Sequence, residues 1–170
     1  MTTKKIDFTI VVDTREQIPY SFNGSVSKCL SAGDYSVLGL EHEISIERKK
    51  VSELHGIVGS DRERFERELD KLSKLQYAAI VIEGNIFDAM QPSPFSNVSP
   101  KAVMNSLLSW SVRYGVHIFF AGSRQYGRAL TLKLLLHYAR HKTSGDIICR
   151  IIKETKTMSG KNTSSESSPP

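Results

Sequence analysis

The sequence predicts an α/β protein with a central mixed β-sheet that is flanked by helices on both faces. Near-continuous apolar runs at 8–13, 77–84 and 116–122 are typical of strands buried on both sides. Amphipathic helical patterns alternate with these runs, as they do in sheets that helices cover. The first three predicted strands follow one another with no long helix between them. Part of the sheet is therefore expected to be antiparallel, unlike a doubly wound nucleotide-binding fold.

Local signals mark the ends of the predicted helices. Ser99 followed by Pro100 predicts a helix start, and Gly115 predicts the end of the same helix. Ser60 and Glu63 have the spacing of a capping box. Along the chain, we expect strands at 8–13, 29–39, 42–50, 77–84 and 116–122, helices at 51–57, 60–75, 99–115 and 123–142, loops at 14–25 and 85–98, and a segment of undecided type at 146–154.

The strand at 42–50 has an unusual polar face. Ile44 and Ile46 lie on one side of it, while Glu47 and Lys49 lie together on the other, because side chains alternate along a strand. An isolated carboxylate and ammonium in this arrangement most simply indicate an edge strand with a solvated ion pair. A catalytic role needs support from other parts of the sequence.

Composition favours a single domain at 1–156 and a disordered polar tail at 157–170. The chain has 170 residues, of which 39% are apolar and 24% charged, as in ordinary globular proteins. No apolar run approaches the length of a membrane span, so no membrane association is expected. Cys29 and Cys149 have no metal-ligand spacing, which favours reduced thiols and an intracellular location in the cytoplasm, nucleoid or nucleus.

Positive charge is concentrated in the C-terminal part of the chain. The net charge is +5 overall, and residues 121–156 contain eight Lys or Arg against two Asp or Glu. Such a surface suits a polyanionic partner such as DNA, although a solvated helix face has the same composition.

Four charged side chains are predicted at strand ends or on a strand face close to them: Asp13, Asp34, Glu47 and Lys49. Carboxylate oxygens are the ligands that Mg²⁺ and Mn²⁺ prefer. A metal bound there lowers the pKa of a coordinated water, and a nearby lysine orients that water and offsets negative charge on a phosphate. The pattern is thus typical of two-carboxylate metal nucleases.

The wider sequence resembles the XPF-type family of structure-specific DNA endonucleases. The stretches that carry the resemblance occur in the family's order over residues 8–142: VVDTRE, AGDYSV, IERKKVSEL, DRERFERELDKL, YAAIVIEG and SLLSWSVRYGVHIFFAGS. The resemblance implies a restriction-endonuclease-like core. It also implies a Mg²⁺- or Mn²⁺-dependent endodeoxyribonuclease that acts on branched, flapped or otherwise structured DNA in repair or recombination.

Matched position by position, the resemblance implies the site residues. Asp13, Asp34, Glu47 and Lys49 fall on catalytic positions, and Glu16 joins the three carboxylates as a metal ligand. Glu16 could instead be a loop residue that supports the ligands. The alternative for the whole chain is a catalytically weak DNA-binding or dimerisation partner of an active nuclease. Because the acidic positions are retained, activity is favoured.

Four arginines are the candidates for DNA binding: Arg62, Arg64, Arg124 and Arg128. The first two could also form ordinary ion pairs on a helix surface. Arg48 should point away from Lys49, so we expect it to hold a neighbouring helix or a carboxylate.

The sequence departs from the family pattern in three places, one of which is Glu68, where the family commonly has an amide. Glu53 stands where the motif has its final aspartate. The residues after 142 are too few for the tandem helix-hairpin-helix module that often follows this core. Two alternatives follow: the chain lacks specificity for branched DNA, or that specificity depends on a partner.

The helix GRALTLKLLLHYARHK at 127–142 predicts a dimer. Its apolar residues, among them Leu135, cover more of the circumference than one core contact needs. XPF-type nuclease domains commonly pair through late helices, so we expect a homodimer or a heterodimer with a related subunit. In the alternative, the segment 146–154 folds back and covers the extra face.

Overall fold

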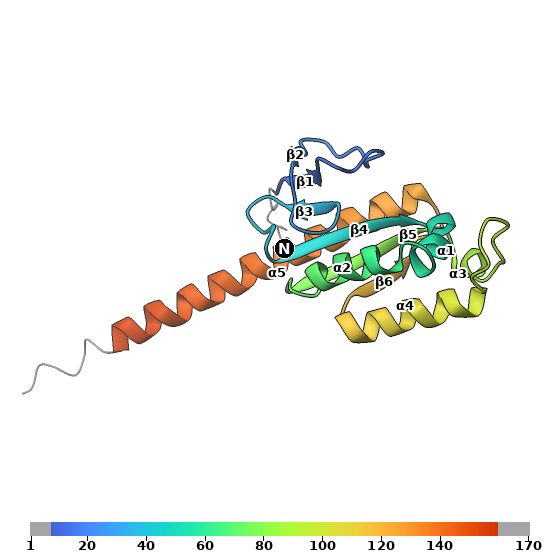
Figure 1. Cartoon of the computed structure of the whole chain (residues 1–170). Helices are drawn as coiled ribbons and strands as arrows, with labels where there is room; N and C mark the ends of the chain where they lie inside the picture. The colour runs from blue at the N-terminus through green and yellow to red at the C-terminus, as the bar shows by residue number, and fades with distance from the viewer. Residues whose placement is uncertain (1–7, 160–170) are drawn as a thin grey trace, which may run out of the picture.

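A computed structural model of the chain describes residues 8–159, and the side chains of residues 8–145 (Figure 1). Its centre is one mixed sheet with the strand order β2-β1-β3-β4-β5-β6. The strands are β1 (Ile10–Asp13), β2 (Val26–Lys28), β3 (Tyr35–Val37), β4 (Ile44–Lys50), β5 (Tyr77–Glu83) and β6 (His117–Phe120).

The strand directions agree with the predicted antiparallel beginning of the sheet. β1 pairs antiparallel with β3, and β3 pairs antiparallel with β4. β4, β5 and β6 then run parallel to one another. The sequence did not predict β2, which pairs parallel with β1. All three of its residues are exposed, so its sequence lacks the apolar pattern that marks a buried strand.

The helices are η1 (Val51–Glu53), α1 (Leu54–Val58), α2 (Arg62–Leu72), α3 (Ile86–Ala89), α4 (Pro100–Tyr114) and α5 (Arg124–Ser159). The predicted ends of α4 are confirmed, since Ser99 accepts a hydrogen bond from the amide of Ala102 and Gly115 has a φ of 65°. The capping box predicted for α2 is wrong. Asp61 is the N-cap residue, and its side chain makes no capping hydrogen bond.

Two apolar cores lie on opposite faces of the sheet. The first contains α1, α2 and α4 around Ile80 and Ile82 of β5. The second contains α5 and the segment after β1, and it includes Ala79 and Val81 of the same strand. Adjacent residues of β5 thus face different cores, as alternation in a doubly covered strand requires. The predicted fold class is confirmed.

Helix α5 is longer than the sequence predicted. It runs continuously from Arg124 to Ser159 and extends beyond the edge of the sheet (Figure 1). The segment 146–154 therefore continues the helix and does not fold back. The helix also enters the first three residues of the predicted tail, while residues 160–170 lie outside the described part of the chain.

The prediction for β6 was partly wrong. It was expected to be buried on both faces, but it is the edge strand and its residues are exposed or half-buried. An apolar run cannot distinguish these positions, because an edge strand still packs against the core on its inner side. Within residues 8–159, no helix is long and apolar enough to cross a membrane.

Candidate active site

Asp34 is held by its backbone at the point where β1, β3 and β4 meet. Its amide donates to the carbonyl of Ile46 at 2.9 Å, and its carbonyl accepts from the amide of Asp13 at 2.8 Å. The preceding Gly33 has a φ of 71°, and a Cβ at Gly33 would overlap the Ser45 hydroxyl. Glycine is required there, because any side chain would meet both a strained backbone and a steric clash.

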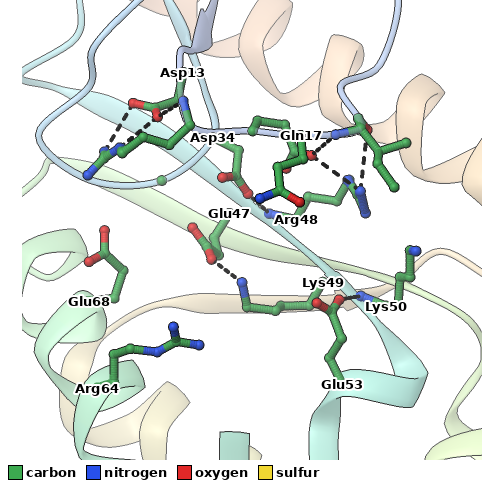
Figure 2. A pocket seen from close by; sticks show the side chains of 14 residues that line it. Asp13, Gln17, Asp34, Glu47, Arg48, Lys49, Lys50, Glu53, Arg64 and Glu68 are labelled. Atoms are coloured by element: carbon green, nitrogen blue, oxygen red, sulfur yellow. Dashed lines mark hydrogen bonds and ion pairs between the residues drawn. The ribbon is translucent and has the colours of Figure 1, made fainter. Parts of the chain in front are cut away.

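Glu47 and Lys49 project from β4 toward Asp34 (Figure 2). Their side chains form an ion pair with each other, and Glu47 is only 5% exposed. The Lys49 ammonium also lies 5.6 Å from the ring centroid of Phe65 in α2. β4 is an inner strand of the sheet, so the simple interpretation of a solvated pair on an edge strand is wrong.

The carboxyl groups of Asp34 and Glu47 both have raised pKa values. Burial and the neighbouring Glu47 raise the pKa of Asp34 to about 8, although the Arg48 amide and the Lys49 ammonium oppose this shift. Burial also raises the pKa of Glu47 above its usual range, with Lys49 again opposing. Burial alone would lower the pKa of Lys49, but Glu47 outweighs it and the pKa is raised. Lys49 therefore stays an ammonium, while burial disfavours the ionised form of both carboxylates.

Asp13 closes β1 and lines the cleft, where the sequence predicted it, and its carboxylate is hydrogen-bonded within the protein. Its Oδ1 accepts from the Arg15 amide and from Arg15 Nε, both at 2.8 Å. Its Oδ2 accepts from Arg15 Nη2 at 3.0 Å and from the Leu30 amide at 2.6 Å. Burial opposes ionisation, but these donors lower the pKa of Asp13. Both oxygens of the Asp13 carboxylate therefore accept hydrogen bonds, and these bonds connect the loop that contains Arg15 to the loop that contains Leu30.

Glu16 and Arg48 form an ion pair, and both residues line the same cleft as Asp34 and Glu47. Arg48 Nη2 is 3.4 Å from Glu16 Oε1, and Arg48 Nη1 is 3.7 Å from Glu83 Oε2. The Glu16 carboxylate also accepts from the amide of Ile18 at 2.8 Å. The prediction that Arg48 holds a carboxylate is confirmed. These contacts match the alternative for Glu16, a loop residue that supports the ligands.

The backbone of Arg48 belongs to the site itself. Its amide donates to Asp34 Oδ2 at 2.7 Å, as Figure 2 shows. The same residue therefore fixes a site carboxylate on one side of β4 and occupies an ion-pair cluster on the other.

Three of the four arginines predicted to bind DNA are engaged within the protein. Arg62 binds the Ser106 hydroxyl at 3.0 Å and lies over the Trp110 ring, so it joins α2 to α4. Arg124 and Arg128 donate to backbone carbonyls of residues 18–21. Only Arg64 reaches the cleft, with a side chain that is 76% exposed and an ion pair to Asp61 at 3.8 Å.

An open cleft of about 520 Å³ surrounds the Asp34–Glu47 pair. Sequence reasoning missed several residues that line it, namely Arg15, Gln17, Lys50 and Glu68. Figure 2 shows Glu68 and Arg64 coming from α2, across the cleft from the loop that carries Gln17. Arg15, Lys50 and Glu68 lie inside the quoted motif stretches, so the resemblance was the signal that could have marked them. Glu53 accepts from the Lys50 amide at 2.5 Å, so this departure from the motif caps the turn after β4.

The oxygen atoms of the pair suit a hard divalent cation. Among the described residues, no group donates to Asp34 Oδ1 or Glu47 Oε2, and no set of three or more His, Cys, Asp or Glu side chains is arranged around a metal position. Mg²⁺ is commonly held by one or two carboxylates, with waters and phosphate oxygens completing its shell. Asp34 and Glu47 fit this arrangement. A cation bound beside these carboxylates would also offset the negative charge of Glu47, which raises the pKa of Asp34.

A mixed sheet with a carboxylate pair and a lysine on inner strands defines a restriction-endonuclease-like nuclease fold. The chain belongs to the ERCC4 domain family, whose model matches residues 12–131. This is a family of structure-specific DNA nucleases. No curated protein matches the chain in sequence.

Solved structures share the fold, and two of them are of XPF from Aeropyrum pernix. XPF from Aeropyrum pernix is 17% identical, with a TM-score of 0.59, and the match covers 79% of this chain and 61% of that one. XPF from Aeropyrum pernix in complex with DNA is 20% identical, with a TM-score of 0.60, and the match covers 82% and 66% of the two chains. The chain thus spans less than two thirds of the length of these relatives.

Proposed function

We propose that this protein is a Mg²⁺- or Mn²⁺-dependent endodeoxyribonuclease that cuts branched, flapped or otherwise structured DNA in repair or recombination. The observation that supports this most directly is the pair formed by half-buried Asp34 and buried Glu47 beside Lys49, which faces an open cleft. A purely structural ion pair would not require a second carboxylate at the same place, since like charges destabilise each other there.

Asp34 and Glu47 are the proposed metal ligands, and Asp13 braces the loops that hold Asp34. The bound metal supplies a coordinated water of lowered pKa and neutralises charge on the phosphate. Lys49 donates to Glu47 and is directed toward the same region, so it orients the attacking water and stabilises the developing negative charge. Arg64 and Lys50 line the cleft, and we expect them to contact the phosphates beside the scissile bond.

The partners proposed are DNA and a second protein subunit. Helix α5 presents one stripe to the sheet, which includes the fully buried Leu135, so the residue first predicted for the interface is wrong. Leu136, one position on, is half-buried, and the helix continues past the sheet. A homodimer or a heterodimer with a related subunit through this outer side of α5 stays a proposal.

Cleavage assays on flapped, branched and linear duplex DNA test the function. With Mg²⁺ or Mn²⁺, the wild-type protein is expected to nick structured DNA, while Ca²⁺ supports binding with little cutting. Asp34→Asn combined with Glu47→Gln should lower the rate by at least about 1,000-fold, because both charged ligands are lost. Asp70→Asn is the matched control, since Asp70 is exposed on α2 and pairs only with Lys74.

Two results would reject the proposal. A double variant that cuts as fast as the wild type places the active site elsewhere. A wild-type protein that binds structured DNA without cutting it under any of these metals supports the alternative of a catalytically weak binding partner.

A further inference from the structure

The segment that follows β1, residues 16–22, is held from one side by the start of α5. Arg124 Nη2 donates to the carbonyls of Ile18 at 2.9 Å and Pro19 at 2.8 Å. One turn later, Arg128 Nε donates to the carbonyl of Ser21 at 2.7 Å. Two arginines on one face of α5 therefore hold successive parts of a segment more than 100 residues away in sequence.

Arg48 holds the same segment and shares three partners with Arg124. The carbonyl of Ile18 accepts from Arg124 and also from Arg48 Nη2 at 3.3 Å. The Glu83 carboxylate lies 3.2 Å from Arg124 Nη1 and 3.7 Å from Arg48 Nη1. The ring of Tyr20 lies near both guanidinium groups, at 4.9 Å from Arg124 and 5.8 Å from Arg48. Arg128 shares none of these three partners among the contacts of the described residues.

We propose that Arg124 is a positioning residue of the active site, acting on Asp34 through Arg48. The route consists of direct contacts: Arg124 fixes Ile18 and Glu83, these two fix the Arg48 side chain, and the Arg48 amide holds the Asp34 carboxylate. This inference rests on the proposed nuclease function for its catalytic consequence, but its structural consequence can be measured without any activity.

Arg124 supplies the second positive charge in a cluster that contains two carboxylates and Arg48. The side chains of Glu16, Glu83 and Arg48 are 11%, 8% and 6% exposed. Without Arg124, two buried carboxylates would share one guanidinium, and a carboxylate lacking a partner is costly at such low exposure. The Arg124 side chain is 43% exposed, so burial of Arg124 itself contributes little. The contact stabilises the fold because it gives the buried Glu83 carboxylate an ion-pair partner.

Gly127 provides a second way to disturb the same contact. A Cβ at Gly127 would overlap the Tyr20 hydroxyl, and Tyr20 is buried and stacked on Tyr35. Glycine inside a helix costs about 1 kcal/mol relative to alanine, so the close approach of α5 to this segment is the physical reason for glycine here. Gly127→Ala pushes Tyr20 away from Arg124 while leaving every charge in place.

The test compares four variants of the full chain on a flapped DNA substrate with Mn²⁺. Arg124→Ala and Gly127→Ala are expected to lower kcat by about tenfold or more, with KM within about twofold of wild type. Arg124→Lys, which keeps the charge, should recover part of the rate. Arg140→Ala removes the same charge from an exposed position further along α5 and is the control. A change confined to KM in Arg124→Ala and equalled in Arg140→Ala would mean simple contact with DNA phosphates and would overturn the proposal.

The amide of Arg48 gives a readout that does not depend on catalysis. In the metal-free protein, the amide of Arg48 should exchange with solvent at least about tenfold faster in Arg124→Ala and Gly127→Ala than in wild type or Arg140→Ala. If the wild type cuts no DNA, the proposed function fails, while this exchange rate still decides the positioning role. An Arg48 amide that exchanges at the wild-type rate in both variants overturns the inference, whatever the activity. Thermal unfolding of each variant confirms that a folded protein is being compared.

Discussion

Replacing Asp34 by asparagine should stabilise the metal-free protein while it removes a proposed metal ligand. Asparagine keeps an oxygen for the Arg48 amide, which donates to Asp34 Oδ2 at 2.7 Å. It carries no charge to oppose Glu47, the neighbour that together with burial raises the pKa of Asp34 from 3.8 to about 8. The variant therefore loses the repulsion and keeps the hydrogen bond.

The size and pH dependence of the effect follow from proton linkage. Between pH 3.8 and about 8, the folded chain holds a proton on Asp34 that the unfolded chain has released. The unfolding free energy of the wild type therefore falls as pH rises through this window. The part of this window that lies below pH 7 corresponds to about 4 kcal/mol. Asp34 is half-buried at the edge of an open cleft, so solvent reduces the expected gain to the order of 1–3 kcal/mol.

Urea unfolding in the presence of a chelator measures this gain. The difference between Asp34→Asn and wild type should be small near pH 4 and should grow until about pH 8. Excess Mg²⁺ at high pH should stabilise the wild type and leave the variant unchanged, because only the wild type has both carboxylates. A variant no more stable than wild type at about pH 8, or a gain that shrinks as pH rises, would refute the idea of a repelling pair. Asp70→Asn serves again as the exposed control.

Three further predictions test the site and the assembly. Lys49→Ala should lower turnover by about 100-fold or more while changing Mn²⁺ affinity by less than about threefold, and equal losses in calorimetry and cleavage would indicate a structural role instead. Gly33→Ala should destabilise the fold by about 2–4 kcal/mol, whereas Gly24→Ala, with the same φ of 71° but no atom within 4 Å, should cost about 1 kcal/mol. Leu136→Glu should convert a dimer seen by light scattering to a monomer of 19.0 kDa without unfolding it, while Leu135→Glu should unfold the chain; a wild-type protein that is monomeric at micromolar concentrations removes the dimer altogether.

The sequence by itself determined the elements that depend on neighbouring residues. Apolar runs predicted β1, β5 and the run that becomes β6, and the pair Ser99–Pro100 with Gly115 predicted both ends of α4. Side-chain alternation placed Glu47 and Lys49 on one face of β4 and Arg48 on the other. These features are readable because periodicity, capping and alternation act over a few residues.

Only the tertiary structure decided which charged groups are available for chemistry. Asp13 is engaged by Arg15 and by the amide of Leu30, 17 residues away, and Arg124 finds its carbonyl partners 105 and 106 residues away. The identity of a charged residue does not indicate which distant residue it will contact in the folded protein. The free energy that ties an arginine to a carbonyl or leaves it open to a phosphate comes from burial and from contacts between distant segments, so it exists only once the sheet and its helices have been assembled.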